Sequence, residues 1–228
     1  MLNNKGMEKL ENINNKGMKM DKKIIFLDLD GTLTNDEKKI TPKTKEALMD
    51  IQKRGHIVAL ASGRPTPGMG FIAKELELEK YGGYVMSFNG GKIIDWKTKE
   101  TVFENTLDRK YLPDLIRYAR QNNLGLITYD NKQGLVATRV DPYVMLETVK
   151  INRIPAFLTD VVKYVDYNPN KCLYTVDPEI SEYHEKRLAE KFGDVLSVYR
   201  STDYFIEIVP KGIDKAASIK VLIDKLNI

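Results

Sequence analysis

The stretch FLDLDGTLT, residues 26–34, ends an apolar run with two aspartates and follows them at once with glycine and threonine. Residues 24–27, which lead into the aspartates, are all apolar. This pattern predicts a strand buried on both faces, as in parallel sheets. Asp28 and Asp30 then fall where the strand leaves the sheet. Because residues two apart in an extended chain point the same way, both carboxylates are expected to face one site.

The composition is that of an ordinary globular protein. The chain has 228 residues, of which 42% are hydrophobic and 30% charged, so it can hold one large domain or two small ones. No apolar run is long enough to cross a bilayer, and the net charge of +4 is spread along the chain, so neither membrane insertion nor nucleic acid binding is expected. The single cysteine, Cys172, excludes an internal disulfide and agrees with a cytoplasmic location. We interpret it as a small strand residue.

Residues 1–20 differ from the rest of the chain. They repeat Asn-Asn-Lys-Gly-Met at 3–7 and 14–18 and lack the apolar centre of a signal peptide. They are predicted to be a disordered leader, to which we assign no function. Because Met18 and Met20 immediately precede the first predicted strand, the biological start could lie there.

After the leader, predicted strands and helices alternate. Thr41 can cap a helix with Pro42 at its first position. A second buried strand over 56–61 leads into ASGRP, a helix pattern covers 67–80, and a third strand over 84–88 closes in NGG. This order predicts an α/β core of parallel strands joined by right-handed crossovers. Ligands of such sheets bind beyond the carboxyl ends of the strands, so the three polar motifs are expected to converge on one edge.

A different rhythm begins after residue 90. Short strand pairs and amphipathic helices follow one another, which predicts an α+β module inserted at 91–199. Residues 21–90 and 200–228 would then form a discontinuous core. The return segment, YFIEIVPKGIDKAASIKVLIDKL, predicts a strand, a glycine-containing turn and a final helix.

The two aspartates predict phosphoryl chemistry if a cation is present. Two carboxylates alone would repel a phosphate, whereas Mg²⁺ takes one or two carboxylates and completes its shell with water and phosphate oxygens. One aspartate could then attack phosphorus while the other protonates the leaving oxygen. Gly31 permits a sharp exit from the strand, and Thr32 offers a hydroxyl to a bound anion. The alternative is an Asp-rich turn that only starts a loop.

Three further polar residues each allow two interpretations. Ser62 could bind phosphate oxygens through its hydroxyl and the adjacent amides, or cap the next helix. Arg64 could pair with an anionic substrate or be a solvated turn residue. Lys215, in the last helix pattern, could reach the site or be merely exposed, as could Lys211.

The three motifs in chain order, Asp-x-Asp-Gly-Thr, Ser-Gly-Arg and Pro-Lys-Gly-x-x-Lys, resemble the haloacid dehalogenase-like (HAD) superfamily. More narrowly, the chain is similar over 22–228 to the Cof-type sugar-phosphatase branch. The resemblance implies a Rossmann-like parallel-sheet core with a large inserted α+β cap of the C2 type. It also implies a Mg²⁺-dependent cytoplasmic phosphatase that hydrolyses small phosphorylated metabolites, with sugar phosphates expected, through an aspartyl-phosphate.

The resemblance also assigns roles to residues. Asp28 would be the nucleophile, Asp30 the general acid and base, and Lys215 the cation that stabilises the phosphoryl group. The Asp28 carboxylate and the Asp30 backbone carbonyl would hold Mg²⁺. The expected substrate and phosphate ligands are Thr32, Ser62, Gly63, Arg64 and Asn89. The candidates in the cap, where no motif names a sugar, are Tyr129, Arg139 and Tyr143.

One motif of the family does not occur. The family's fourth motif, Gly-Asp closely followed by Asn-Asp, supplies further carboxylates for Mg²⁺, but the sequence stops at Ile228 without it. Gly193-Asp194 precedes the lysine motif and lacks the Asn-Asp partner. The core is therefore expected to be incomplete at its C-terminal end, with an unpaired edge on the strand that carries Asp28. We favour truncation of a longer phosphatase. The alternatives are a gene that lost its end and a partner chain that completes the sheet in an oligomer.

Two other functions stay open at this point. A binding protein could hold a phosphorylated ligand through Ser62, Arg64 and Lys215 without turnover, and a phosphomutase of the same superfamily could move a phosphoryl group within one sugar. Hydrolysis should need Mg²⁺ and Asp28, whereas anion binding alone should tolerate Asp28→Asn.

Overall fold

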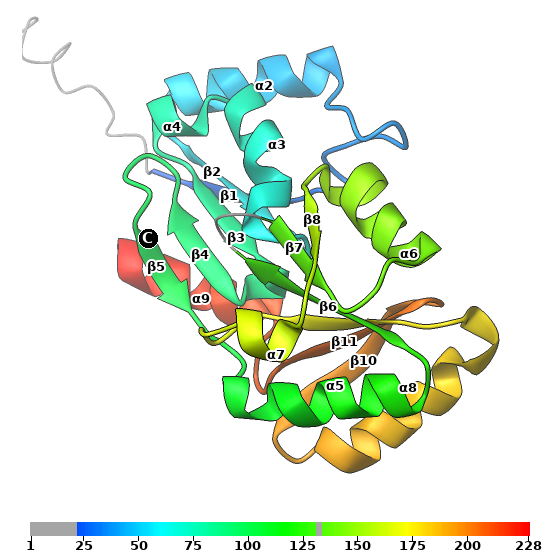
Figure 1. Ribbon diagram of the computed structural model, residues 1–228. Coiled ribbons are helices and arrows are strands. Elements are labelled where there is room, and N and C mark those ends of the chain that lie inside the picture. Colours follow the sequence, from blue (N-terminus) through cyan, green and yellow to red (C-terminus); the bar gives the residue numbers. More distant parts are fainter. Residues whose placement is uncertain (1–21, 131–133) are drawn as a thin grey trace, which may run out of the picture.

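The structure, a computed structural model, describes residues 22–130 and 134–228. Two β-sheets lie one beyond the other, and each is covered by helices (Figure 1). The predicted leader over 1–20 lies outside the described residues. Within the described ranges, no helix has both the length and the hydrophobicity to cross a membrane.

The first sheet confirms the parallel core. Its strand order is β1-β2-β3-β4-β5. The strands are β1 (Ile24–Asp28), β2 (Ile57–Ala61), β3 (Tyr84–Ser87), β4 (Lys92–Asp95) and β5 (Thr101–Glu104). The first three run parallel, whereas β4 and β5 are added as antiparallel strands. The carboxyl ends of β1, β2 and β3 therefore share one edge, as the motifs predict.

Helices cover both faces of the first sheet. They are α2 (Pro42–Lys53), the 3₁₀ turn η1 (Thr66–Met69), α3 (Gly70–Glu75), α4 (Leu78–Tyr81), the 3₁₀ turn η2 (Phe88–Gly90) and α9 (Lys215–Leu226). Helices α2, α3 and α4 pack on one face in a core that includes Leu48 and Ile72, and α9 packs on the other face through Leu222. Thr41 caps α2 by accepting from the Thr44 amide at 3.3 Å, and Pro42 is its first residue, as predicted.

Two details of this sheet differ from prediction. Strand β1 is half-buried, because it lies at the edge of the sheet within the described residues. The single helix expected over 67–80 is broken, since Glu77 adopts a left-handed backbone with φ of 51°. Leu76 and Leu78 on either side of the break are both fully buried. A continuous helix would point residues two apart in different directions, so the break lets both leucines enter the core.

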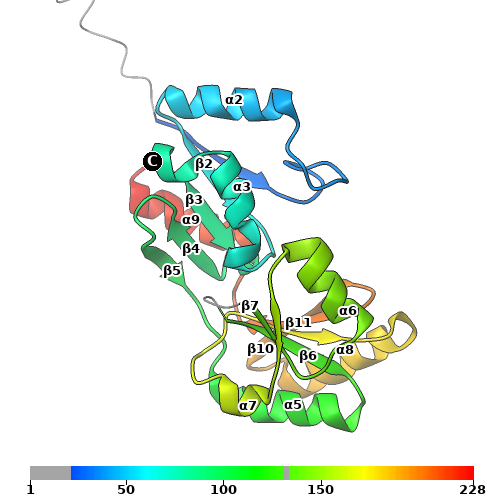
Figure 2. The same cartoon turned by 45° about the horizontal axis from the view of Figure 1, so that its top comes forward.

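The second sheet is mainly antiparallel, as the α+β pattern predicts. Its order is β10-β11-β9-β6-β7-β8. The strands are β6 (Gly125–Asp130), β7 (Gly134–Ala137), β8 (Ala156–Leu158), β9 (Cys172–Thr175), β10 (Leu196–Thr202) and β11 (Phe205–Pro210). The helical segments are the 3₁₀ turn η3 (Arg109–Tyr111), α5 (Leu112–Gln121), α6 (Pro142–Met145), the π-helical η4 (Leu146–Asn152), α7 (Val161–Tyr164) and α8 (Pro178–Phe192). Helices α5, α7 and α8 cover the sheet face that points away from the first sheet (Figure 2).

The predicted boundaries at 91–199 do not follow the two sheets. Hairpin β4/β5 pairs with β3 and belongs to the first sheet, while β11 pairs with β9 and belongs to the second. The segment that builds the second sheet therefore begins after Glu104 and ends at Pro210. A hairpin has the same alternating pattern whichever sheet it joins, so its partner could not be read from the sequence. The buried Ile93 on β4 attaches the hairpin to the first core.

Candidate active site

Asp28 and Asp30 lie on either side of the point where β1 ends. Asp28 is the last residue of the strand, and a tight turn follows in which the Leu33 amide donates to the Asp28 carbonyl at 3.0 Å. The Thr34 amide closes the same turn on the Leu29 carbonyl at 2.9 Å. Gly31 has a φ of +77°, a conformation that glycine adopts without strain. The turn thus directs the chain back past the strand end.

Lys215 reaches Asp28 from the far end of the chain. Its Nζ lies 2.5 Å from Asp28 Oδ1, and both side chains are a little over one third exposed. Lys215 is the first residue of α9, whose start is capped by the Asp214 carboxylate accepting from the Ala217 amide at 2.7 Å. The cap fixes the beginning of the helix, and with it the backbone that carries the lysine.

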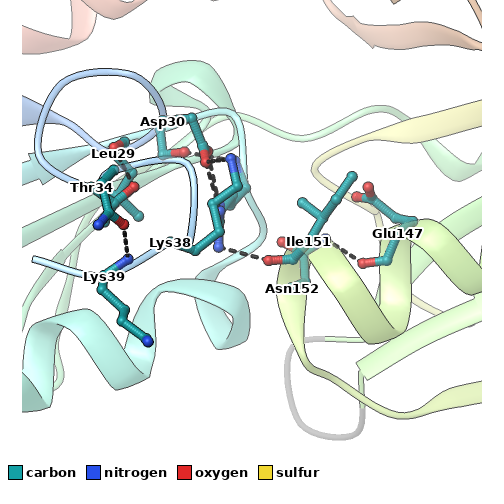
Figure 3. A network of polar contacts seen from close by, with 11 residues as sticks. Leu29, Asp30, Thr34, Lys38, Lys39, Glu147, Ile151 and Asn152 are labelled. Carbon is teal, nitrogen blue, oxygen red and sulfur yellow. Dashed lines mark hydrogen bonds and ion pairs between the residues drawn. The ribbon is translucent and has the colours of Figure 1, made fainter.

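Asp30 is held by two cations. Arg64 donates from Nε to Asp30 Oδ2 at 3.0 Å and from a terminal nitrogen to Oδ1 at 2.7 Å, a bidentate pair, and Lys38 Nζ contacts Oδ1 at 2.7 Å (Figure 3). Partial burial acts to raise the pKa of Asp30, but hydrogen bonds and charge from Arg64 and Lys38 outweigh it and hold that pKa below its ordinary value. In this arrangement Asp30 is an ionised acceptor.

Lys38 was missed at the sequence level. It lies eight positions after Asp30 in a lysine-rich loop, where its neighbour Lys39 pairs instead with Glu37. Its backbone is left-handed, with φ of 59°. A lysine does not indicate such a backbone in the sequence, as a glycine or asparagine would. Only the folded loop brings its side chain back to the strand end.

Arg64 also joins the two sheets. Its remaining terminal nitrogen donates to the backbone carbonyl of Ile151, in η4, at 2.7 Å. The guanidinium side chain is only 4% exposed, so it is a buried charge with three hydrogen bonds and not a solvated turn residue. Figure 3 shows Ile151 facing the loop that carries Asp30 and Lys38. Any substrate contact by Arg64 would compete with these partners.

Ser62, Gly63 and Asn89 form a compact group beyond β2 and β3. The Ser62 hydroxyl accepts from the Arg64 amide at 3.2 Å, and the Asn89 amide donates to the Ser62 carbonyl at 3.0 Å. A Cβ on residue 63 would lie 3.1 Å from Asn89 Oδ1, so glycine lets the Asn89 side chain lie across the loop. Asn89 in turn donates to the Tyr199 hydroxyl at 3.2 Å. The group is therefore built of interlocked turns, with the buried Ser62 at its centre.

Thr32, the remaining predicted phosphate ligand, lies exposed on the turn after β1. Its role remains a prediction. Lys211, the other lysine of the PKGIDK motif, is also exposed, and Lys215 is the one that reaches Asp28.

A cavity of about 160 Å³ lies between the two sheets, beside Asp30. Core residues Ser62, Gly63 and Arg64 line one side. The opposite side carries charged residues of the second sheet and of η4, namely Glu147, Lys171 and Glu207. None of these three was singled out from sequence; the signal available was a glutamate in the middle of the apolar run FIEIVP.

The three residues considered earlier for the cap fare differently. Tyr129 is buried beside the cavity and donates to Glu147 Oε1 at 2.6 Å. Arg139 pairs with Asp141 at 3.2 Å, and Tyr143 stacks on Tyr204 with ring centroids 5.1 Å apart. Tyr129 therefore hydrogen-bonds a residue that lines the cavity.

The donor set for a magnesium ion is small. Across residues 22–130 and 134–228, no group of three or more His, Cys, Asp or Glu side chains is placed to hold a metal. The Asp28 carboxylate and the Asp30 backbone carbonyl supply two oxygens at the strand end. Mg²⁺ is commonly held by one or two carboxylates, with waters and substrate phosphate oxygens in the other positions, so these two groups fit part of a shell.

The chain belongs to the haloacid dehalogenase-like hydrolases, since the model of that family matches residues 25–228. The fold agrees with this assignment: a crystal structure of a haloacid dehalogenase-like hydrolase from Bacteroides thetaiotaomicron superposes with a TM-score of 0.87 at 40% sequence identity, over 91% of this chain and 78% of that one. The chain is therefore a member of the hydrolase family that its motifs resemble.

Two further similarities are informative. The Bacillus subtilis protein named "Putative phosphatase YxeH" is 29% identical over 219 residues, which cover 90% of this chain and 77% of that protein. The HAD subclass IIB sugar phosphatase BT4131 superposes with a TM-score of 0.73 at 16% identity, over 90% of this chain and 76% of that one. At that identity the second similarity shows a shared fold.

Proposed function

We propose that this protein is a Mg²⁺-dependent phosphatase that hydrolyses small phosphorylated metabolites, with sugar phosphates as the main class, through an aspartyl-phosphate. The observation that carries the proposal is the 2.5 Å contact between Lys215 Nζ and Asp28 Oδ1. It supports a charge-stabilised nucleophile at the carboxyl edge of the parallel strands, in a chain whose family is hydrolytic. The B. subtilis relative, which carries the word phosphatase in its name, also supports it.

In the first step an Asp28 carboxylate oxygen attacks phosphorus, and the bond from phosphorus to the ester oxygen breaks. The leaving oxygen takes a proton from Asp30. In the second step a water loses a proton to Asp30 and attacks phosphorus, which breaks the bond to Asp28 and releases phosphate. Lys215 stabilises the negative charge of the phosphoryl oxygens in both steps.

Mg²⁺, held by the Asp28 carboxylate and the Asp30 carbonyl, would neutralise phosphate charge as the ester approaches. Asp30 must carry a proton to act as an acid, yet Arg64 and Lys38 favour its ionised form. We infer that substrate phosphate competes for these cations, which frees Asp30 to bind a proton. Ser62 and the adjacent amides would bind phosphate oxygens that Asp28 and Lys215 leave free.

The test is phosphate release from a panel of sugar phosphates and an aryl phosphate, by the unsubstituted chain and by Asp28→Asn, with Mg²⁺ and with a chelator. Release that needs both Mg²⁺ and Asp28 is the expected result. Absence of release from a chain that unfolds cooperatively, and is therefore folded, contradicts turnover by this polypeptide.

A second function, binding of a phosphorylated ligand without turnover, is favoured by one observation. Asp30 accepts hydrogen bonds from Arg64 and Lys38, so in this state it cannot donate a proton. Under this alternative, calorimetry should detect a phosphorylated ligand whose affinity is the same in the unsubstituted chain and in Asp28→Asn, with no phosphate released.

A further inference from the structure

Three charged side chains are buried in the cavity wall that belongs to the second sheet and η4, opposite the strand ends of the first sheet. Lys171, Glu207 and Glu147 are only 3%, 5% and 6% exposed. They come from three different elements: Lys171 precedes β9, Glu207 lies within β11, and Glu147 lies in η4. All three line the cavity that Asp30 and Ser62 line from the other side.

Stability alone does not account for these charges. Apolar residues, among them Leu173 and Phe205, pack together on the same face of the second sheet. Burying an ion costs free energy that a pair recovers only in part, and apolar replacements of similar volume are often equally stable. Lys171 Nζ lies 3.4 Å from Glu207 Oε1 and donates to the Gly63 carbonyl at 3.1 Å, so its charge is balanced within the cavity wall.

The carboxylates exceed the ammonium groups in this wall. Glu147 Oε1 accepts from Tyr129, and Glu207 Oε2 accepts from the Tyr199 hydroxyl at 3.1 Å. The second oxygen of Glu147 has no hydrogen-bond donor among the residues that the structure describes. The cavity wall therefore carries two negative charges against one positive charge, with acceptor capacity left over. Arg64, the other cation at the cavity, is taken up by Asp30 and Ile151.

We propose that Glu147, Lys171 and Glu207 form the subsite for the leaving group, and that the subsite selects an uncharged polyol. The proposal rests on the proposed function. Hydroxyl groups can donate to the two carboxylates and accept from the ammonium group. A leaving group that carries a carboxylate or a second phosphate would bring a negative charge against two buried carboxylates, which disfavours its binding. Small sugar and sugar-alcohol monophosphates fit this chemistry, whereas phosphorylated hydroxy acids and bisphosphates do not.

Equilibrium binding tests the subsite independently of turnover. In Asp28→Asn, which cannot form the aspartyl-phosphate, calorimetry with Mg²⁺ would compare glucitol 6-phosphate, 3-phosphoglycerate and inorganic phosphate. We expect glucitol 6-phosphate to bind at least about tenfold more tightly than either of the others, since hydrogen-bonded polar groups discriminate strongly. Adding Glu147→Gln or Glu207→Gln should reduce this preference to about threefold or less.

The control is Glu190→Gln, the same change at an exposed position of α8, which should leave the preference unchanged. Unfolding midpoints confirm that each variant is folded. Equal binding of the polyol phosphate and 3-phosphoglycerate overturns the proposal, as does no binding, or a preference that survives both glutamine substitutions. Aryl phosphate hydrolysis by the unsubstituted chain reports separately on the proposed function. Phosphate release without a binding preference for the polyol phosphate contradicts the subsite but not hydrolysis. A binding preference without phosphate release contradicts hydrolysis but not the subsite.

Discussion

The strand-end site of the first sheet and the cavity wall of the second sheet use charge in different settings. Asp28 and Lys215 pair where both side chains are more than one third exposed, so water can replace either partner. Lys171 and Glu207 pair where both side chains are almost fully buried, at 4% and 6% side-chain exposure. The first pair can rearrange when a substrate arrives at little cost in stability. The second pair is fixed by burial, as expected of a wall that recognises shape and charge.

The largest effect on stability is expected for Lys171→Met. Removing the ammonium leaves Glu207 buried without its ion-pair partner, which should lower the free energy of unfolding by about 3 kcal/mol. Denaturant unfolding measures this. A loss below about 1 kcal/mol would mean that the cavity wall is as tolerant as the strand-end site.

The same substitution at Lys215 should have little effect on stability and a large effect on catalysis. Because the Lys215–Asp28 pair is partly exposed, Lys215→Met should change stability by less than about 1 kcal/mol. Loss of charge stabilisation should lower kcat for an aryl phosphate about 100-fold. Steady-state kinetics and unfolding on one preparation would separate the two effects, and unchanged kcat would remove Lys215 from the proposed machinery.

Arg64 connects the strand-end site of the first sheet with η4, on the side of the second sheet. Arg64→Met removes the bidentate pair to Asp30 and the bond to the Ile151 carbonyl, so we expect a loss of about 1–3 kcal/mol in unfolding free energy. Asp30, at 40% side-chain exposure, can be rehydrated, which keeps the loss moderate. Arg54→Met, at an exposed i,i+4 pair with Asp50, is the matched control and should cost less than about 0.5 kcal/mol. Equal losses for the two variants would argue against a coupling role for Arg64.

The smallest effect concerns the pH dependence of stability. The pKa of Asp30 is lowered in the folded protein, so its contribution is fully present above the unfolded pKa of about 3.9 and is lost as pH falls through the folded value. The stability difference between the unsubstituted chain and Asp30→Asn should therefore shrink between about pH 5 and pH 3, by less than about 1 kcal/mol because 40% of the side chain is exposed to solvent. Unfolding at stepped pH measures it; a difference that grows toward pH 3 would contradict the sign.

Local signals in the sequence predicted the three parallel strands of the first sheet and the polar residues at their carboxyl ends. The apolar runs that end in Asp28, near Ser62 and near Asn89 are each short and continuous, and parallel strands bring their carboxyl ends together whatever the rest of the chain does. The Thr41 cap is likewise a signal of a few residues. Cys172, interpreted as a small strand residue, is fully buried in β9, where burial raises the pKa of its thiol to about 12.

Features that depend on distant partners could not be predicted. The β4/β5 hairpin has the pattern of either sheet, and the Arg64 to Ile151 contact joins residues 87 positions apart. Lys171 resembles an ordinary surface charge in the sequence until the fold buries it beside Glu207. Whether a lysine is exposed or part of a site is decided by tertiary contacts, which one sequence does not contain.

The most direct test of the account is to trap the covalent intermediate. After an acid quench of the reaction with an aryl phosphate and Mg²⁺, mass spectrometry should find one phosphoryl group on the peptide that contains Asp28, and none in Asp28→Asn. The signal should increase in Asp30→Asn, because an aryl leaving group needs little acid whereas the second step loses its base. Phosphate release with no phosphoryl group on Asp28 in any of the three proteins would contradict the aspartyl-phosphate mechanism.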